Sequence, residues 1–335
     1  MPQLEVPDKY FEKPVEPGKT YTYKGPCLSI SYKCNTDICE YCYARSQRMD
    51  KDMSVEDFTK VLKWLKEISD TREIFLVGGE PTIIKNLKEY LDAAKKEEFE
   101  VNIYTNGGFK EEVRNLLITH PSVMEVIFHY EPRFFKIISK ENYLKNIEEI
   151  SKKKKVMMLY TTSDPNFDYS EVLDWAKKYK MLIRWIFATP TKGNTPYLSL
   201  AEMKKSRKHL QKFLLEALEN GVETIPDLSF PLCVFDKEFV EKYYKKLNLV
   251  KMCFPFAYIK PTLGTQFCSS VPEFIHEPVK DSKELLKIID NYKAERKKMD
   301  KIYAFKECKT CEWNNVYCQG GCLCYRLYGK EASKK

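Results

Sequence analysis

Apolar residues follow two spacings in alternation between Cys27 and about Gly221. Short apolar or alternating runs are typical of strands, whereas apolar residues three and four apart indicate amphipathic helices. We predict strands over residues 27–32, 73–77, 100–105, 123–130, 156–162 and 181–188. Helices are expected from Ser54, from about Ile83 and Lys110, and from near Lys140, Ser170 and Ser199.

The first helix has the clearest signals. Ser54 is a favourable N-cap, and Asp57 follows three residues later. Residues at helical spacing behind the cap form the predicted buried stripe: Val55, Phe58, Val61, Leu62, Leu65 and Ile68.

Six consecutive strand–helix units favour an α/β fold with a parallel sheet and helices outside it, because a parallel crossover needs a helix-length connection. The units could form a doubly wound sheet or an incomplete barrel, and both place ligands at the carboxyl ends of the strands. Beyond Pro226 the alternation stops, and residues 233–328 carry eight of the 12 cysteines. We therefore predict a second, small domain stabilised by metal.

These patterns give the expected domain bounds. The predicted parts are an N-terminal extension at 1–26, a partial (β/α)6 barrel at 27–225, a cysteine-rich domain at 226–330 and a frayed polar tail at 331–335.

Composition narrows the class of protein. No apolar run reaches the ~18 residues of a membrane span and residues 1–5 do not resemble a secretory signal, so we expect a cytoplasmic location without membrane association. Cytosolic thiols stay reduced, which favours metal ligation or catalysis over disulfides. The net charge of +8 is spread along the chain, and the run 152–155 is expected to be a solvated helix end rather than a nucleic-acid patch.

Three cysteines follow the first predicted strand. Cys34, Cys39 and Cys42 lie within nine residues of an irregular loop, so their thiolates can converge on one soft metal centre. Three ligands suggest an open coordination position or a distant fourth ligand, and a zinc site is the alternative.

Two further strand ends carry polar groups on the same predicted rim. Gly78 and Gly79 leave bare backbone that a ligand can approach, and Glu80 can accept hydrogen bonds from an ammonium group. Thr105 and Asn106 end the third strand. A soft-metal loop, a glycine–carboxylate turn and a polar turn on successive strands form a stronger signal than any one of them.

These motifs resemble the radical S-adenosylmethionine (radical SAM) superfamily, whose members have a three-cysteine loop after strand one and a Gly-Gly-Glu motif after strand two. The resemblance implies a partial six-unit barrel in which Cys34, Cys39 and Cys42 hold a [4Fe–4S] cluster that binds SAM. It also implies that Tyr41 packs by the adenine. The residues implied to contact the methionyl group are Gly78, Gly79 and Glu80, with Thr105 and Asn106 as further contacts.

The role of Arg184 is open. This residue, in the sixth strand, could reach the SAM carboxylate or form a surface salt bridge.

The spacing of the first two cysteines differs from the usual family pattern. The family usually has three residues between these cysteines, whereas four residues separate Cys34 and Cys39 here. The extra residue can bulge from an irregular loop. Cys27 is the alternative ligand, although the favoured interpretation is a strand cysteine that faces inward.

The later cysteines form a second group around a predicted hairpin with its turn near Leu263 and Gly264. They resemble the SPASM extension of some radical SAM enzymes, which holds up to two auxiliary iron–sulfur clusters; structural zinc is the competing explanation. The resemblance assigns one cluster to Cys308, Cys311, Cys318 and Cys324. It assigns the other to Cys253, Cys268 and Cys322, with Cys233 as its candidate fourth ligand. Three [4Fe–4S] clusters would use eleven of the 12 cysteines and leave Cys27 over.

The resemblance implies reductive cleavage of SAM to a 5′-deoxyadenosyl radical, which abstracts hydrogen from a peptide or protein side chain to give a thioether or carbon–carbon crosslink or an epimer. A flavodoxin- or ferredoxin-type protein would donate the electron.

With 26 residues before Cys27, leader recognition is expected from a separate partner protein or from the barrel. Ser269 stands where sulfatase-maturing members usually have Asp, which disfavours that activity. The alternatives are a radical SAM enzyme acting on a small metabolite or lipid, and a zinc-ribbon nucleic-acid-binding protein.

Overall fold

The structure is a computed structural model that describes residues 25–192, 196–249, 253, 257–271 and 274–334. Nearly all of the predicted N-terminal extension lies outside these residues. The chain divides into two compact units. The cysteine-loop unit comprises described residues between 25 and 157 and between 257 and 293, and the C-terminal unit comprises those between 158 and 253 and between 294 and 334. The domain bounds given above differ from these and stay a prediction.

The cysteine-loop unit contains a parallel sheet. The strands are β1 (Cys27–Ser31), β2 (Glu73–Gly78), β3 (Glu100–Thr105) and β4 (Val123–Tyr130). They pair in parallel in the order β4-β3-β2-β1, with Leu28 opposite Leu76 and Leu76 opposite Ile103. These residues are fully buried, as expected for a parallel sheet covered on both faces.

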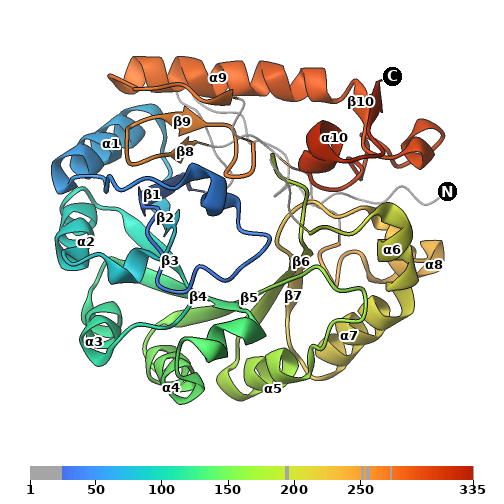
Figure 1. Cartoon of the computed structure of the whole chain (residues 1–335), viewed down its shortest axis with the longest axis horizontal. Coiled ribbons are helices and arrows are strands. Elements are labelled where there is room, and N and C mark those ends of the chain that lie inside the picture. The colour runs from blue at the N-terminus through green and yellow to red at the C-terminus, as the bar shows by residue number, and fades with distance from the viewer. Residues whose placement is uncertain (1–24, 193–195, 250–252, 254–256, 272–273, 335) are drawn as a thin grey trace. The chain divides into compact units, whose positions relative to one another are not determined.

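Helices lie outside these strands (Figure 1). They are α1 (Val55–Ile68), α2 (Leu87–Lys96), α3 (Glu111–Thr119) and α4 (Lys140–Ser151). The predicted cap of α1 is confirmed, because the Ser54 hydroxyl accepts a hydrogen bond from the Asp57 amide at 3.0 Å. The predicted stripe is buried except at Val55, which is half-buried.

The helix expected from Ile83 begins instead at Leu87. A short 3-10 helix, η3 (Pro81–Ile83), precedes it, and the Glu80 side chain caps that helix by accepting a hydrogen bond from the Thr82 amide. The prediction was wrong because Pro81 and the Glu80 cap hold these residues in a separate turn.

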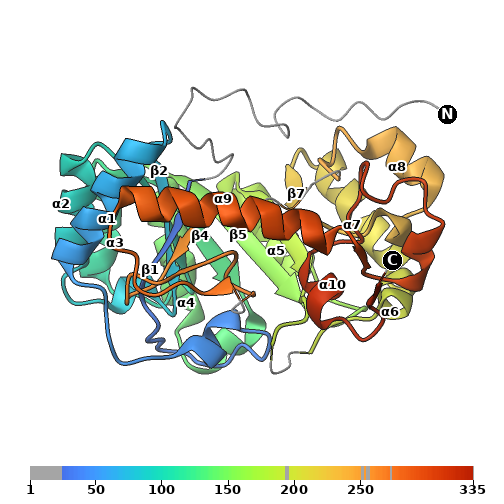
Figure 2. The ribbon, with the colours of Figure 1, turned by 90° about the horizontal axis from the view of Figure 1, so that it is seen from above.

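The predicted hairpin is confirmed. Strands β8 (Tyr258–Ile259) and β9 (Thr265–Gln266) pair antiparallel, and β8 also pairs in parallel with β1, beside which it lies in Figure 2. At the turn, Leu263 has a left-handed backbone with φ of 65°.

The C-terminal unit continues the alternation of strands and helices. Its elements are β6 (Leu182–Phe187), β7 (Thr224–Pro226), α5 (Ser170–Tyr179), α6 (Leu200–Lys205), α7 (Arg207–Glu219), α8 (Lys237–Tyr243), α10 (Cys324–Tyr328), β10 (Ile302–Tyr303) and β11 (Ser333–Lys334). Strand β5 (Lys155–Thr162) and helix α9 (Ser282–Met299) have residues in both units.

Three features of the C-terminal unit differ from expectation. The helix expected from Ser199 is interrupted at Ser206, whose hydroxyl donates to the Met203 carbonyl at 2.7 Å. Strand β7 was not predicted, because three residues are too short to show a period. The expectation of a frayed tail is wrong at Ser333 and Lys334, because their backbone pairs with β10.

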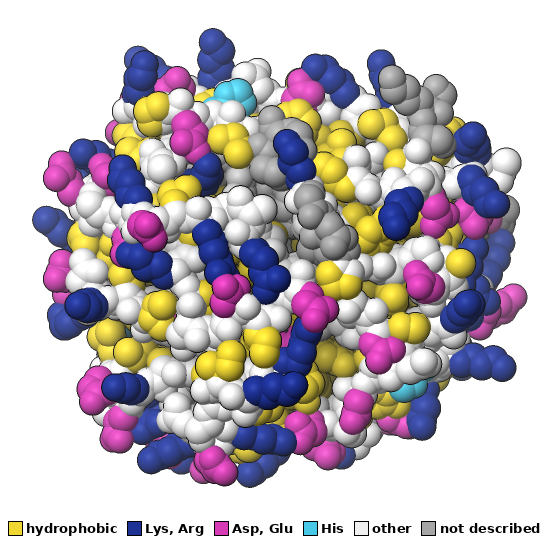
Figure 3. Space-filling view, viewed as in Figure 1, with side chains coloured by type: hydrophobic (Ala, Val, Ile, Leu, Met, Phe, Trp, Pro, Cys, Tyr) yellow, Lys and Arg dark blue, Asp and Glu magenta, His cyan; other side chains and the backbone are white. Residues whose placement is uncertain are grey.

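Charged side chains are interspersed over the face shown in Figure 3, where Lys and Arg alternate with Asp and Glu among the described residues. The ends of the run 152–155 are exposed, and Lys152 pairs with Glu149 on α4 at 3.1 Å. No helix in the described part of the chain is long and apolar enough to cross a membrane.

Candidate active site

The three cysteines of the first motif lie in an irregular loop that ends at the short 3-10 helix η2 (Tyr43–Gln47). Cys34, Cys39 and Cys42 are all half-buried, and the Cys42 amide donates to the Cys39 carbonyl at 3.2 Å. Burial raises the pKa of the Cys39 thiol, and the charges of Cys42 and Cys34 raise it further. The three sulfur atoms are therefore close enough to act on one another.

The longer spacing between Cys34 and Cys39 is accommodated at Asp37. Its φ of 45° is left-handed, a conformation that Asp tolerates better than most residues. The Asp37 carboxylate forms an ion pair with Arg48, and its carbonyl accepts a hydrogen bond from Arg45 at 3.1 Å. The hydrogen bonds from Arg48 lower the pKa of Asp37. Both arginines belong to the turn after Cys42, so the loop is closed on itself.

Glu80 lies at the centre of the polar groups beyond β2 and β3, and it is 1% exposed. Its Oε1 accepts hydrogen bonds from the Thr82 hydroxyl at 2.6 Å and the Thr105 hydroxyl at 2.8 Å, and its Oε2 accepts one from the Asn106 amide at 2.6 Å. Burial raises the pKa of Glu80 despite these hydrogen bonds. A carboxylate here joins two strand ends.

Gly78 and Gly79 pack against the end of β1. A Cβ on Gly78, whose φ is 132°, would lie 2.1 Å from the Ser31 carbonyl oxygen. A Cβ on Gly79 would lie 2.0 Å from the Lys33 carbonyl oxygen. Only glycine therefore lets β2 approach β1 this closely, which gives the two glycines a packing role besides the predicted contact with a ligand.

Asn106 connects this rim to the cysteine loop. Its side-chain amide donates to the Asn35 side-chain oxygen at 2.7 Å and to the Thr36 hydroxyl at 3.4 Å. The Thr36 hydroxyl is in turn 3.4 Å from the Cys34 sulfur. The structure thus brings the predicted residues Cys34, Glu80, Thr105 and Asn106 into one connected polar network.

Tyr41 joins the same loop to the end of β4. Its hydroxyl donates to Glu131 Oε2 at 2.8 Å and lies 3.3 Å from His129 Nε2. Arg133 donates to both carboxylate oxygens of Glu131, at 2.9 and 3.0 Å, and pairs with Glu40 at 2.8 Å. Burial acts to raise the pKa of Glu131, but the hydrogen bonds from Arg133 and Tyr41 outweigh it and lower that pKa.

Sequence analysis missed Glu131 and Arg133. The available signal was their position, because Glu131-Pro132-Arg133 directly follows the predicted strand 123–130 on the same rim as the other site residues. A short charged motif after a strand is common on protein surfaces, and its partner Tyr41 lies 90 residues earlier.

Arg184, the candidate ligand of the SAM carboxylate, is buried in β6 of the C-terminal unit at 5% exposure. Its guanidinium pairs with the Asp227 carboxylate, which follows β7. This ion pair is internal and not the surface salt bridge considered from sequence; the contact with SAM stays a prediction.

The C-terminal unit holds seven of the remaining cysteines. Cys308 lies in the 3-10 helix η7 (Lys306–Lys309), Cys318 is buried, and the Gly320 amide donates to the Cys318 sulfur at 3.3 Å. The Cys253 amide and carbonyl both pair with the Gln319 side chain, at 3.1 and 3.4 Å. Cys268 belongs to the cysteine-loop unit, where its backbone forms an isolated antiparallel β-bridge with Val271.

The ligand atoms of both cysteine groups, the loop of Cys34, Cys39 and Cys42 and the later cysteines, fit iron–sulfur clusters. Within the described residues, no three or more His, Cys, Asp or Glu side chains converge as they would around a single metal ion. A [4Fe–4S] cluster spreads its thiolate ligands over separate iron atoms, so it does not require such convergence. The three thiols of the loop provide the soft ligands that this cofactor takes, and neighbouring amide and hydroxyl groups can hydrogen-bond to them.

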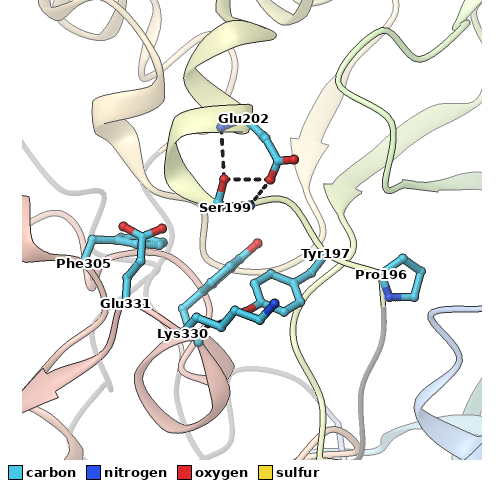
Figure 4. A pocket seen from close by; sticks show the side chains of 9 residues that line it. Pro196, Tyr197, Ser199, Glu202, Phe305, Lys330 and Glu331 are labelled. Carbon is cyan, nitrogen blue, oxygen red and sulfur yellow. Dashed lines mark hydrogen bonds between the residues drawn. The ribbon is translucent and has the colours of Figure 1, made fainter.

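A cavity of about 270 Å³ lies elsewhere in the C-terminal unit, between the start of α6 and residues 329–331 (Figure 4). Tyr197, Phe305 and Tyr325 contribute its aromatic lining. Ser199 and Glu202 form a reciprocal capping box there, and Lys330 donates its amide to the Tyr197 hydroxyl at 3.2 Å. None of the predicted site residues lines this cavity.

Comparisons with known proteins agree with this geometry. Residues 28–129 match the model of the Radical SAM superfamily, and these residues include the cysteine loop, Glu80 and Asn106. No curated protein matches the chain.

The fold is similar to that of solved radical SAM enzymes. Streptococcus suis SuiB bound to S-adenosylmethionine is 15% identical, with a TM-score of 0.62 over 91% of this chain and 74% of that chain. Native anSMEcpe with bound AdoMet and Kp18Cys peptide is 17% identical, with a TM-score of 0.67 over 93% of this chain and 92% of that chain. SuiB bound to its precursor peptide SuiA is 14% identical, with a TM-score of 0.60 over 90% and 71%.

This likeness supports the predicted α/β fold. Of the two arrangements considered from sequence, it favours the partial barrel and not the doubly wound sheet. The match of residues 28–129 to the Radical SAM superfamily model, together with this fold, indicates that the chain is an enzyme.

Proposed function

We propose that this enzyme cleaves S-adenosylmethionine reductively and abstracts a hydrogen atom from a peptide or protein side chain. The observation that carries the proposal is the network from the Cys34 thiol through Thr36 and Asn106 to Glu80, which ties the cysteine loop to a buried carboxylate. Structural zinc would need the thiols but not that carboxylate.

In this proposal Cys34, Cys39 and Cys42 hold a [4Fe–4S] cluster that, when bound, supplies the electron for SAM cleavage to a 5′-deoxyadenosyl radical. Glu80, Thr105 and Asn106 fix the rim on which the methionyl group binds. Tyr41 is held by Glu131 and Arg133, so that its ring keeps one orientation beside the nucleoside. The later cysteines hold auxiliary clusters, and a flavodoxin- or ferredoxin-type protein donates the electron.

One observation supports a peptide or protein substrate. The chain covers most of SuiB, solved with the precursor peptide SuiA, and nearly all of anSMEcpe, solved with the Kp18Cys peptide.

The first experiment measures 5′-deoxyadenosine after anaerobic reduction of the reconstituted full chain with SAM. We expect the nucleoside from the native protein and at least a 100-fold loss in Cys39→Ala, because one missing thiolate opens the cluster. Cys27→Ala is the matched control, since it removes a half-buried cysteine from the adjoining strand and should retain cleavage. Retained cleavage in Cys39→Ala contradicts the ligand assignment.

The second experiment tests the substrate class. Deuterium-labelled peptides encoded beside the gene are incubated with enzyme and SAM, and mass spectrometry follows deuterium in 5′-deoxyadenosine and small mass losses in the peptide. Transfer of deuterium supports the proposal. Cleavage of SAM that transfers label only from a small metabolite or lipid extract would instead support the alternative substrate class.

A further inference from the structure

Cys233 lies beside the cysteines at 308–318, although 75 residues separate it from Cys308 in sequence. It belongs to the 3-10 helix η5 (Leu232–Val234), which follows β7. The Cys318 thiol donates to the Phe230 carbonyl at 3.9 Å, and a Cβ on Gly321 would lie 2.9 Å from Pro231. The segment 230–233 is therefore packed directly on the segment 318–321.

Ion pairs hold the flanking residues in the same arrangement. Lys237, four residues after Cys233, lies 3.3 Å from Glu312, which follows Cys311. Lys204 lies 3.6 Å from Glu307, which precedes Cys308. The Arg207 guanidinium donates to the carbonyl groups of Cys233 and Val234 at 3.4 and 2.6 Å. The backbone of η5 is thus fixed from two sides.

The glycines after Cys318 leave room for sulfur. Gly320, with φ of 72°, would place a Cβ 3.2 Å from the Cys308 sulfur and 2.7 Å from the Ala304 side chain. Its amide already donates to the Cys318 sulfur. Hydrogen bonds from amides to cluster sulfurs are a usual means of tuning an iron–sulfur site. The Cys233 thiol is close enough to the thiols of Cys318, Cys308 and Cys311 to interact with each of them electrostatically.

Cys324 lies in a different place. It is fully buried at the first position of α10, and its thiol hydrogen-bonds to the Cys322 thiol. Cys322 also hydrogen-bonds to the Thr189 side chain. The resemblance to the SPASM extension implied a grouping of Cys324 with Cys308, Cys311 and Cys318, whereas these contacts pair it with Cys322.

We propose that Cys233, Cys308, Cys311 and Cys318 are the four thiolate ligands of one auxiliary iron–sulfur cluster. Cys324 is not a ligand of that cluster and pairs instead with Cys322. This inference rests on the proposed function only in assuming iron–sulfur chemistry at the C-terminal cysteines. The four thiols come from two segments, 230–234 and 306–318, so the cluster would crosslink the barrel strand β7 to the cysteine-rich segment.

The test uses the full chain with Cys34, Cys39 and Cys42 changed to alanine, so that only auxiliary clusters contribute iron. Iron, sulfide and low-temperature electron paramagnetic resonance are measured after anaerobic reconstitution. We expect Cys233→Ala to lose about four irons and four sulfides, as Cys308→Ala does, and the double variant to lose no more. Adding Cys308→Ala to the control Cys324→Ala should remove about four further irons.

A ligand role is separated from a packing role by Cys233→Ser. An oxygen ligand should retain iron at this cluster but shift its resonance, whereas a packing residue would leave the spectrum unchanged. The inference is overturned if Cys233→Ala keeps all its iron, if its iron loss adds to that of Cys308→Ala, or if zinc without sulfide fills these thiols. If these variants behave as expected while the native protein releases no 5′-deoxyadenosine, the proposed function fails and this inference stands.

Discussion

Glu80 illustrates how a single side chain is chosen by its surroundings. Its carboxylate accepts hydrogen bonds from four donors: the amide and hydroxyl of Thr82, the Thr105 hydroxyl and the Asn106 amide. Glutamine would direct an NH2 group at one of these donors, and leaving a buried donor unsatisfied costs roughly 1–3 kcal/mol. The residue is therefore Glu for structural reasons as well as for any contact with an ammonium group.

Arg133 likewise acts on a single neighbouring side chain, because its guanidinium keeps Glu131 charged. Because the pKa of Glu131 is lowered in the folded protein, its contribution to stability is present above the unfolded pKa and is lost as the pH falls through the folded pKa. In Arg133→Met, burial is no longer offset by the guanidinium, so the pKa of Glu131 should rise. The stabilising contribution of ionised Glu131 to the free energy of unfolding at neutral pH should then shrink, so acid should cost the variant less stability than it costs the native protein.

Urea unfolding of the two proteins between pH 7 and about pH 3 measures this difference, because the folded pKa of Glu131 lies below its unfolded value. Lys136→Met is the matched control, because Lys136 is exposed and lies with Arg133 in the 3-10 helix η4 (Pro132–Lys136). Superimposable pH profiles for Arg133→Met and the native protein would show that Arg133 does not set the charge of Glu131.

At the scale of elements, the contact between β1 and β2 depends on backbone proximity. Gly79→Ala should lower the free energy of unfolding by about 2 kcal/mol or more, because its Cβ would meet the Lys33 carbonyl. In the control Gly221→Ala, φ is 70° but no atom lies within 4 Å, so about 1–2 kcal/mol of backbone strain is expected. Equal losses in the two variants, measured by chemical denaturation, would mean that the clash at Gly79 is relieved by a small shift.

Many of the helix and strand positions were predictable from the sequence. Strands β3 and β4 begin and end as predicted, and the α1 cap forms as expected, because each is fixed by local periodicity or a local hydrogen bond. The start of α2 was misplaced because the Glu80 cap depends on a side chain with tertiary partners. Likewise Cys233 could not be grouped with Cys308 from spacing, since the contact arises from packing of the segment 230–233 on residues 318–321.

At the scale of the whole molecule, regular structure is distributed unevenly. The cysteine-loop unit has its buried sheet and the C-terminal unit has β6, β7 and helices α5 to α8, whereas residues 300–334 contain two short helices and two two-residue strands. A segment with so little core of its own is expected to depend on bound metal for its order. The buried Arg326 adds hydrogen bonds to the Gln319 and Met299 carbonyls, both at 2.9 Å.

Metal removal should therefore unfold the molecule unevenly. After oxidation and chelation of iron, hydrogen exchange should accelerate at least 10-fold in residues 303–324, while α1 and β3 keep their protection. Hydrogen exchange with mass spectrometry compares the two regions within the same sample. Unchanged protection of residues 303–324 in the iron-free protein would contradict a stabilising role of metal there.

The pairing of Cys253 with Gln319 has a consequence for biosynthesis. Its two hydrogen bonds join residues 66 positions apart, and Arg296 adds a third contact to the Cys253 carbonyl at 3.2 Å. A nascent chain cannot form this pairing until residue 319 has left the ribosome. Cys253 is thus held in place only late in translation, so cofactor insertion that depends on it must follow, rather than accompany, synthesis of the barrel strands.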